Sequence, residues 1–275
     1  MKVSCIIPSY RQAAYLRACL DSIAAQNLAT GEFEVRVYDG GSDDGTTEIL
    51  AGHPLHPWWV SERDAGQGAA VNRGLRESRG EIIAWINSDD YYLPEALPAV
   101  LEAFAANPTV EVIYGNARNV DEAGRDRGPH PVEPWSYAAL ADRCFLCQPA
   151  VFFRRSVVEK AGCLDESLKL ALDYEYWLRL GKTRAFLHLP RDLAANRVHA
   201  ASKTSRLPVQ GRREALLVSH RHTGRWSAAW LGSLASRTSE NFWAQLGLHS
   251  SALTWLGKQL LLPVYRLRLR RSGHP

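Results

Sequence analysis

The stretch Ile82-Ile83-Ala84-Trp85-Ile86-Asn87-Ser88-Asp89-Asp90 carries an apolar run directly into two adjacent aspartates. Its first five residues have the length and composition of a strand that is buried on both faces. Adjacent carboxylates repel each other and are costly to desolvate, so this position needs a compensating cation. Mg²⁺ and Mn²⁺ bind such oxygens, often together with substrate phosphates. We predict a metal site at Asp89 and Asp90; the alternative is a solvated turn in which Asp89 caps a helix near Pro94.

Strand and helix patterns alternate on both sides of this stretch. Leu16, Cys19, Leu20 and Ile23 follow the i, i+3, i+4, i+7 spacing of one helix face. Repeated strand–helix–strand units predict an α/β fold with a mostly parallel sheet and helices on both faces. The expected strands are residues 3–7, 33–38, 58–61, 82–86 and 111–114, and the expected further helices are residues 67–78 and 95–106.

The second half of the chain is less regular. Residues 115–145 are rich in Gly, Pro, Asp and Arg and are predicted to be a loop-rich crossover. A strand at residues 148–153 and a helix at residues 174–180 follow. Beyond them the composition changes to Arg, Ser, Leu and Trp with helical character. We therefore predict a Rossmann-like domain at residues 1–205 and a helical C-terminal extension at residues 206–275.

Three polar clusters stand at the expected strand ends: Ser9-Tyr10, Asp39 to Asp44, and Asn87 to Asp90. In open α/β sheets, ligands bind beyond the carboxyl ends of the strands, so we expect these clusters to converge on one cleft. The Asp39 carboxylate can accept hydrogen bonds from a nucleotide base or a ribose diol, and the glycines behind it allow close approach of the backbone. The alternative is a helix start capped by Ser42 or Asp43, and both can hold together.

The segment after the third expected strand, residues 62–68, contains Arg63 and Asp64. Arg63 can pair with a phosphate, or it can neutralise its acidic neighbours; spacing does not decide between these interpretations. No G-x-G-x-x-G fingerprint and no G-x-x-x-x-G-K loop is present in the sequence.

Composition sets broad limits. The hydrophobic fraction of 46% and the charged fraction of 23% are those of an ordinary soluble globular protein. The net charge of +4 is mild and by itself says little about partners. We expect no nucleic-acid partner. No run approaches the ~20 apolar residues of a spanning helix, and no signal peptide is visible, so we expect a cytoplasmic protein. The five scattered cysteines predict free thiols, with Cys144 and Cys147 facing the core.

The tail from Leu253 to Arg271 combines Trp255 and Tyr265 with four arginines. Aromatic residues beside a basic cluster suit an anionic membrane face, which would make the protein peripheral on the inner membrane. The alternatives are a helix packed on the first domain with a basic end, or a dimer contact. The four arginines are Arg266, Arg268, Arg270 and Arg271.

Taken together and in this order, these segments resemble the family 2 glycosyltransferases, inverting enzymes with the GT-A fold. The resemblance covers roughly residues 3–200, and its strength lies in several motifs that occur in register. The matching stretches are Ile6-Ile7-Pro8-Ser9-Tyr10, Asp39 to Thr46, Glu62-Arg63-Asp64-x-Gly66, Ala70-x-Asn72-x-Gly74, Trp85 to Asp90, Gln148-Pro149-Ala150 and Leu170 to Arg179.

The resemblance implies a pocket for a nucleotide diphosphate sugar. Asp39 would contact the base, and Arg63 and Asp64 would border the base and ribose. The Asn87-Ser88-Asp89 segment takes the place of the family's Asp-x-Asp. The implied donor-binding residues are Pro8, Ser9, Tyr10, Asp39, Arg63, Asp64, Asn72, Asn87, Ser88 and Asp89.

The resemblance also implies a divalent cofactor, Mn²⁺ or Mg²⁺, held by Asp89 with Asp90 close by and His199 near the metal and the diphosphate. Asn87 stands where an acid is common, so the ion loses one charged ligand. Asp173 would be the catalytic base; the alternative is that Asp173 caps the helix that follows it.

The expected function is therefore a metal-dependent inverting glycosyltransferase. It would move a sugar, with a uridine-linked donor as the default, to a hydroxyl of a glycan or lipid-linked acceptor in cell-envelope polysaccharide assembly. One alternative is a nucleotidyltransferase, which would need a basic, Gly-rich loop where the chain has Pro8 to Gln12. Another is a non-catalytic nucleotide-sugar-binding protein, against which Asp89, Asp90 and Asp173 argue.

Overall fold

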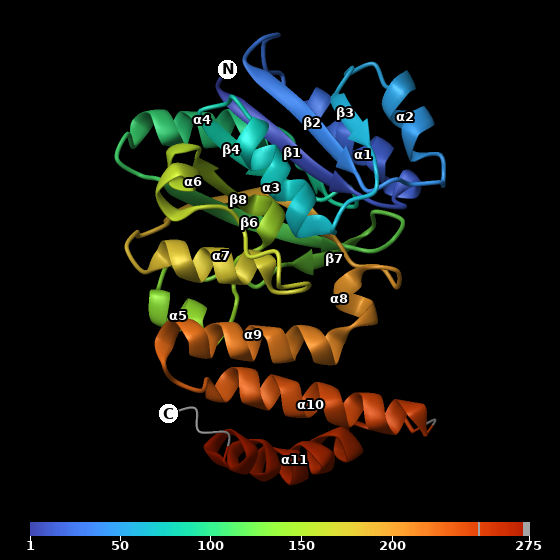
Figure 1. Cartoon of the computed structure of the whole chain (residues 1–275), viewed down its shortest axis with the longest axis vertical. Helices are drawn as coiled ribbons and strands as arrows, with labels where there is room; N and C mark the ends of the chain where they lie inside the picture. The colour runs from blue at the N-terminus through green and yellow to red at the C-terminus, as the bar shows by residue number, and fades with distance from the viewer. Residues whose placement is uncertain (247, 272–275) are drawn as a thin grey trace.

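The computed structural model describes residues 1–246 and 248–271 and shows an α/β fold with helices on both faces of one sheet (Figure 1). The strands are β1 (Val3–Ser9), β2 (Phe33–Asp39), β3 (Trp58–Ser61), β4 (Ile82–Trp85), β5 (Tyr91–Tyr92), β6 (Val112–Val120), β7 (Asp126–Pro129), β8 (Val151–Arg154) and β9 (Leu187–Arg197). Their order is β3-β2-β1-β4-β8-β6-β9-β5, with β7 paired to β6. Within the described residues, β1–β4, β6 and β9 run in one direction and β5, β7 and β8 run opposite, so the sheet is mostly parallel.

Helices follow most of the parallel strands, as the alternating pattern requires. The α1 face predicted from helical spacing is confirmed, because Leu16, Cys19, Leu20 and Ile23 are its buried residues. The helices are α1 (Ala13–Ala24), α2 (Thr46–Gly52), α3 (Gln67–Glu77), α4 (Ala96–Ala106), α5 (Tyr137–Asp142), α6 (Ser156–Ala161), α7 (Leu172–Gly181), α8 (Lys203–Arg206), α9 (Pro208–Thr223), α10 (Ala228–Gln245) and α11 (Ser251–Arg271), with a 3₁₀ turn, η1, at Gln148–Ala150.

Both faces of β1 are buried, which explains its continuous apolar sequence. Cys5 and Ile7 pack on the face covered by α1 and α4, whereas Ile6 packs on the opposite face with α3 and α7. A Cβ at position 74 would collide with Ile6, so α3 can lie this close to the sheet only because Gly74 has no side chain.

The C-terminal helices form a stack beneath α7 (Figure 1). Helix α9 packs on α7, and its Ala215 and Val218 belong to the same apolar cluster as Trp177 of α7. Helix α10 packs on α9, and α11 packs on α10. The proposed division after residue 205 thus places α9 in the extension although α9 shares the core of the first domain. Across residues 1–246 and 248–271, no helix is both long enough and apolar enough to cross a membrane.

Two interpretations of local structure need correction. The loop-rich crossover predicted at residues 115–145 also contains regular structure: β6 continues to Val120 between β7 and β9, and α5 forms at Tyr137–Asp142. Pairing with strands on both sides keeps β6 extended through polar residues that lack a strand pattern. Helix α2 is also not capped by Ser42 or Asp43, because it begins at Thr46 behind Gly45.

Candidate active site

The candidate active site lies where β1, β2 and β4 end. The register pairs Ser9 with Asp39, and the Gly40 N–H donates to the Ser9 carbonyl at 2.9 Å. The Ile86 N–H donates to the Ile6 carbonyl at 3.1 Å, so the chain after β4 emerges beside the end of β1. Strand β9 runs in the same direction, and its carboxyl end reaches the same edge. The polar strand ends therefore lie along one edge of the sheet.

The Asp39 carboxylate is buried and organises its own loop. One oxygen accepts from the N–H groups of Gly41 at 3.1 Å and Ser42 at 2.8 Å, and from the Ser61 hydroxyl at 2.6 Å. The other oxygen accepts from the Ser42 hydroxyl at 2.5 Å. These bonds explain why Ser42 does not cap α2, and they fix the backbone of residues 39–42 at the mouth of the site.

The residues that follow β1, β2 and β3 form one surface, the Tyr10–Asp64 surface, which is suited to a nucleoside. Tyr10 is 57% exposed, and a Cβ placed on Gly40 would lie 3.2 Å from its ring and 3.4 Å from the Asp64 carboxylate. Asp64 accepts from the Gly66 N–H at 2.8 Å, and Arg63 beside it is exposed. The bare backbone at position 40 thus lies between an aromatic ring and a carboxylate.

Ser9 and Pro8 are buried under this surface. The Ser9 hydroxyl has no hydrogen-bond partner among the described residues. A buried hydroxyl without a partner is uncommon, and this one stands at the carboxyl end of β1.

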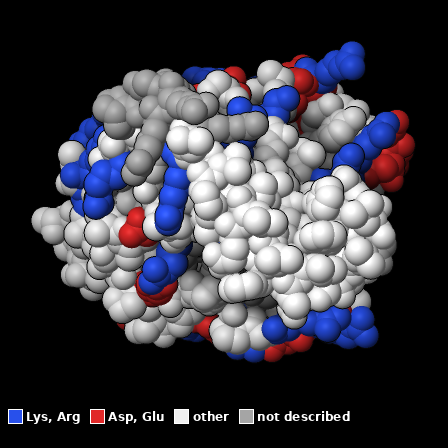
Figure 2. All heavy atoms as spheres, turned by 90° about the horizontal axis from the view of Figure 1, so that it is seen from below, with Lys and Arg blue, Asp and Glu red and all other residues white. Residues whose placement is uncertain are grey.

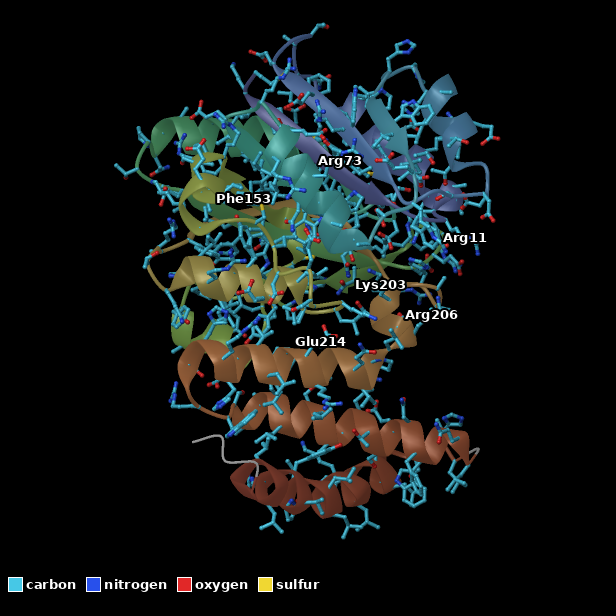
Figure 3. The ribbon with its side chains drawn as sticks, in the orientation of Figure 1. Arg11, Arg73, Phe153, Lys203, Arg206 and Glu214 are labelled. Carbon is cyan, nitrogen blue, oxygen red and sulfur yellow. The ribbon has the colours of Figure 1, made fainter. Side chains whose placement is uncertain are left out.

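The Asn87 side chain is the centre of a polar chain that the sequence did not reveal. Its amide donates to Gln148 at 2.9 Å and accepts from Gln67 at 2.8 Å. Lys203 in turn donates to the Gln67 side chain at 3.1 Å (Figure 3). Burial lowers the pKa of Lys203, and the Asp64 carboxylate partly opposes that shift. Ser88 is buried, so Asn87 and Lys203 form the polar surface of this part of the site.

Asp89 and His199 face each other across 110 positions of sequence. The Asp89 Oδ2 atom lies 3.0 Å from His199 Nε2, and the Asp89 side chain is 17% exposed. The imidazole is buried, its ring lies 4.7 Å from the ring of Tyr15, and its Nδ1 atom has no partner in the described part of the chain. His199 reaches Asp89 because β9 and β4 end at the same edge.

Asp90 points into the protein. It is 4% exposed, and its carboxylate accepts from the backbone N–H of Arg197 at 2.8 Å. The Arg197 guanidinium donates to the Asp89 carbonyl at 2.9 Å, so the two residues tie the ends of β4 and β9 together. Burial, and next the charge of Asp89, raise the pKa of Asp90 well above its usual range. This arrangement favours a structural role for Asp90 in place of the predicted metal contact.

Asp89 and His199 nevertheless fit a divalent ion. Their facing oxygen and nitrogen are 3.0 Å apart, close to the roughly 3 Å between adjacent ligands of an octahedral ion with bonds of about 2.1 Å. Mg²⁺ is commonly held by one or two protein ligands together with substrate phosphates. No group of three or more His, Cys, Asp or Glu side chains suited to a metal occurs in residues 1–246 and 248–271, so the remaining ligands would come from the donor and water.

Asp173 lies in the first turn of α7, which begins at Leu172 behind Ala171; the alternative that Asp173 caps this helix is therefore wrong. Leu172 contacts α3 at Gly68, which brings the start of α7 beside the start of α3. The carboxylate has no side-chain partner within the described residues. Burial raises its pKa, and the N–H groups of its own helical turn oppose that shift. Such a carboxylate is suited to accept a proton.

Two further observations concern Asp90, Asp173 and Asn72, which were predicted to belong to the site. Burial, and next the charges of nearby groups that include Asp90 and Asp173, raise the pKa of the Cys147 thiol well above its usual range. The Asn72 amide donates to the Leu164 carbonyl at 3.0 Å and accepts from the Leu164 N–H at 2.8 Å. It also donates to Glu166 at 2.7 Å, so its polar atoms hold a loop and are not directed at a donor.

The C-terminal helices hold the segment that carries Asp173. A single Glu214 oxygen of α9 accepts from the N–H groups of Lys169 at 3.1 Å, Leu170 at 2.8 Å and Ala171 at 3.2 Å (Figure 3). These three residues lead directly into α7. Glu214 is therefore a positioning residue for Asp173, and neither helical periodicity nor motif spacing could have indicated it.

We expect Glu214→Ala to lower the rate of catalysis by about 10- to 100-fold with little effect on donor affinity. Loss of the three contacts would let Asp173 move, and a displacement of about 1 Å in a reacting group can lower the rate by about this factor. Glu214→Gln keeps one acceptor oxygen and should restore most of the rate. The measurement is kcat against donor KM for both variants. Equal losses in the two variants, or a change confined to donor KM, would show that the three N–H contacts do not position Asp173.

The arrangement of strands is that of the GT-A fold. The crystal structure of S. aureus TarS 1–349 in complex with UDP-GlcNAc superimposes with a TM-score of 0.66 at 20% identity, covering 88% of this chain and 73% of that one. The mannosyltransferase PcManGT of Pyrobaculum calidifontis in complex with GDP-Man and Mn²⁺ superimposes with a TM-score of 0.61 at 18% identity, covering 99% of this chain and 84% of that one. At these identities the likeness shows the fold.

The sequence comparisons show the family. The family model described as "Glycosyl transferase family 2" matches residues 4–161, and the chain belongs to that family. Chondroitin synthase of Escherichia coli is 29% identical over 206 residues, which cover 74% of this chain and 30% of that protein. An uncharacterized glycosyltransferase of Nostoc sp., alr2836, is 27% identical over 226 residues and is covered over 66% of its length. The chain thus spans only part of these relatives.

Proposed function

We propose that the chain transfers a sugar from a nucleotide diphosphate sugar to a hydroxyl of a glycan or lipid-linked acceptor, with inversion at the anomeric carbon. Membership of the family supports the reaction class. The observation that supports the proposal is that the Tyr10–Asp64 surface and the Asp89–His199 pair both follow the carboxyl ends of strands, with the Asp173 carboxylate at the start of α7 beside the start of α3. The TarS structure contains UDP-GlcNAc, and a uridine-linked donor is the one we expect here.

On the acceptor side, Asp173 removes the proton of the acceptor hydroxyl as that oxygen bonds to the anomeric carbon. The bond from this carbon to the diphosphate oxygen breaks, and its electron pair leaves with the nucleotide diphosphate. A single displacement of this kind inverts the configuration. The raised pKa of Asp173 makes it a stronger base than an exposed aspartate, which favours proton transfer once it is ionised.

On the donor side, Asp89 and His199 would hold Mg²⁺ or Mn²⁺, which when bound offsets the negative charge of the departing diphosphate. Lys203 supplies a second positive charge at the same edge through its contact with Gln67. Tyr10 offers a ring face to the base, and the backbone at Gly40 allows close approach of the nucleoside.

The test is a thermal-shift panel of nucleotide sugars with and without Mn²⁺. Ligand at a hundredfold excess over Kd adds about 2.7 kcal/mol to the free energy of unfolding, which gives a measurable shift. We expect one nucleotide diphosphate sugar to stabilise the protein and Mn²⁺ to increase that shift. Free sugars serve as the negative control. Absence of a shift with every nucleotide sugar would contradict the proposal.

Release of nucleotide diphosphate from the selected donor distinguishes an enzyme from a non-catalytic binding protein. We expect slow donor hydrolysis by the wild type without acceptor. Binding without any hydrolysis or transfer would support the binding protein instead.

A further inference from the structure

The outer face of α11 exposes a continuous apolar stripe. Leu256, Leu260, Val264 and Leu267 recur at intervals of four, four and three residues, which places them on one side of the helix. Their exposed fractions lie between 46% and 66%, and Trp255 beside them is 61% exposed. A helix of a globular protein normally turns such a stripe toward the core.

The opposite face of α11 is already packed, so this exposure is not a consequence of a detached helix. Leu262 and Tyr265 lie in an apolar cluster with Leu231 and Leu234, two residues of α10. The Trp243 indole donates to the Leu253 carbonyl at 2.9 Å. Helix α11 is therefore fixed on α10 with a second apolar face directed outward.

Further exposed apolar residues lie on α10, the helix on which α11 packs, and in the segment that follows it. Phe242, Leu246 and Leu248, at and just beyond the end of α10, are also about half exposed. Seen from below, the molecule presents a broad area without charged residues, with Lys and Arg side chains gathered beside it (Figure 2). Exposed apolar residues that are grouped on one helix face mark an interaction site more often than scattered exposed residues do.

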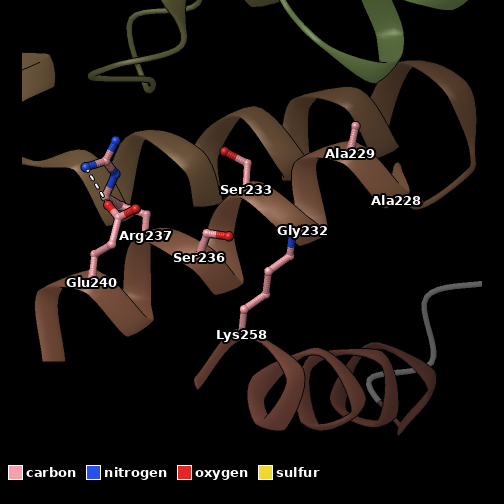
Figure 4. A pocket seen from close by; sticks show the side chains of 8 residues that line it. All are labelled: Ala228, Ala229, Gly232, Ser233, Ser236, Arg237, Glu240 and Lys258. Carbon is pink, nitrogen blue, oxygen red and sulfur yellow. Dashed lines mark ion pairs between the residues drawn. The ribbon is translucent and has the colours of Figure 1, made fainter. Parts of the chain in front are cut away.

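The charges of α11 have one sign. Its sequence contains Lys258, Arg266 and three further arginines, but no Asp or Glu. A hollow between α10 and α11 has Lys258 on one side and the Arg237–Glu240 ion pair, at 2.7 Å, on the other (Figure 4). Glu240 is the single acidic residue in the sequence of α10 and α11. The further arginines, Arg268, Arg270 and Arg271, are named from the sequence, because their side chains lie outside the described residues.

This charge distribution favours an anionic partner over a second copy of the chain. A twofold interface through the stripe would bring two α11 helices of equal positive charge against each other. An anionic lipid surface would instead attract the basic residues while the apolar stripe enters the boundary between headgroups and acyl chains. We propose that the outer face of α11 docks the protein on an anionic membrane surface. This inference does not depend on the proposed reaction.

The test is sedimentation of the full chain with vesicles of phosphatidylcholine alone or mixed with phosphatidylglycerol. We expect the wild type to bind the anionic vesicles, and to bind them more weakly at high salt. The L260D/V264D variant should have a partition coefficient about tenfold lower than that of the wild type, or lower still. The matched control is A105D/T109D, which adds the same two charges to an exposed segment at the end of α4 and should bind like the wild type.

Three results would overturn the inference: no binding to anionic vesicles, equal binding of the stripe variant, or equal binding to neutral vesicles. Analytical ultracentrifugation without lipid tests whether a second copy of the chain binds this face instead. A wild-type dimer that L260D/V264D dissociates, together with no vesicle binding, would assign the face to a second copy. Thermal melts of both variants establish that each is folded, which the exposure of all four positions leads us to expect.

Discussion

Asp173→Asn is expected to lower kcat for sugar transfer by about 10²–10⁴-fold while the Kd for the donor stays within about twofold of wild type. The amide has the shape of the carboxylate but cannot accept the proton of the acceptor hydroxyl. No side chain of another described residue bonds to Asp173, and the Asn oxygen can still accept from the N–H groups of its own helical turn, so we expect the structure of the site to be kept. Transfer at the wild-type rate would show that another group is the base.

The pH dependence of the wild type gives a second readout. Because burial raises the pKa of Asp173, the acidic limb of the kcat profile should lie above the usual range of an aspartate. The rate should fall as pH decreases through this raised pKa, since the base is then protonated. The residual rate of Asp173→Asn should lack that limb. A wild-type profile whose acidic limb lies at the pKa of an exposed aspartate would contradict this assignment.

The raised pKa of Asp173 also affects the stability of the folded protein. A carboxyl group whose folded pKa is raised stabilises the protein below its unfolded pKa, and that contribution is lost as pH rises through the folded pKa. At neutral pH the ionised Asp173 therefore has an unfavourable burial cost that Asn does not have. We expect the Tm of Asp173→Asn at pH 7 to equal or exceed that of wild type. A clear loss of Tm would indicate a structural role.

Local pattern was sufficient for the elements that are buried in a regular way. The helical spacing of Leu16 to Ile23 and the apolar run at Ile82–Trp85 predicted α1 and β4, because in both the pattern of apolar residues reflects direct contact with the core. It failed for β9, whose sequence contains Pro190 and Asp192. That strand is specified by pairing with β6, more than 70 positions earlier, and no local window contains this information.

In the site, too, local pattern predicted some features and failed for others. Polar residues after apolar strands were predicted to share one edge of the sheet, and they do so because parallel strands share a direction. The partners of those residues could not be predicted. Lys203 meets Gln67 across 136 positions, and Glu214 meets the segment before α7 across more than 40. Such contacts depend on where the C-terminal helices pack, which the sequence did not indicate.

The second large effect is expected at Asp89. Asp89→Asn should lower kcat/KM for the donor by about 10²–10³-fold, as loss of one group that stabilises developing charge commonly does. It should also abolish the increase in Tm that Mn²⁺ gives in the presence of the nucleotide diphosphate, because the carboxylate that faces His199 at 3.0 Å is gone. The Tm readout does not require turnover, so it separates loss of metal binding from loss of chemistry.

Asp90→Asn is the matched control, since sequence alone cannot distinguish the two neighbouring aspartates. The Asn oxygen can still accept from the Arg197 N–H, so we expect the Mn²⁺ response to be kept. If Asp90→Asn loses the response and Asp89→Asn keeps it, the ion lies on the inner carboxylate and the Asp89–His199 assignment is wrong. If both variants keep it, neither aspartate is an essential ligand. Burial separates the two side chains in the turn after β4: Asp90 is 4% exposed and bonds to the Arg197 N–H, whereas Asp89 faces His199.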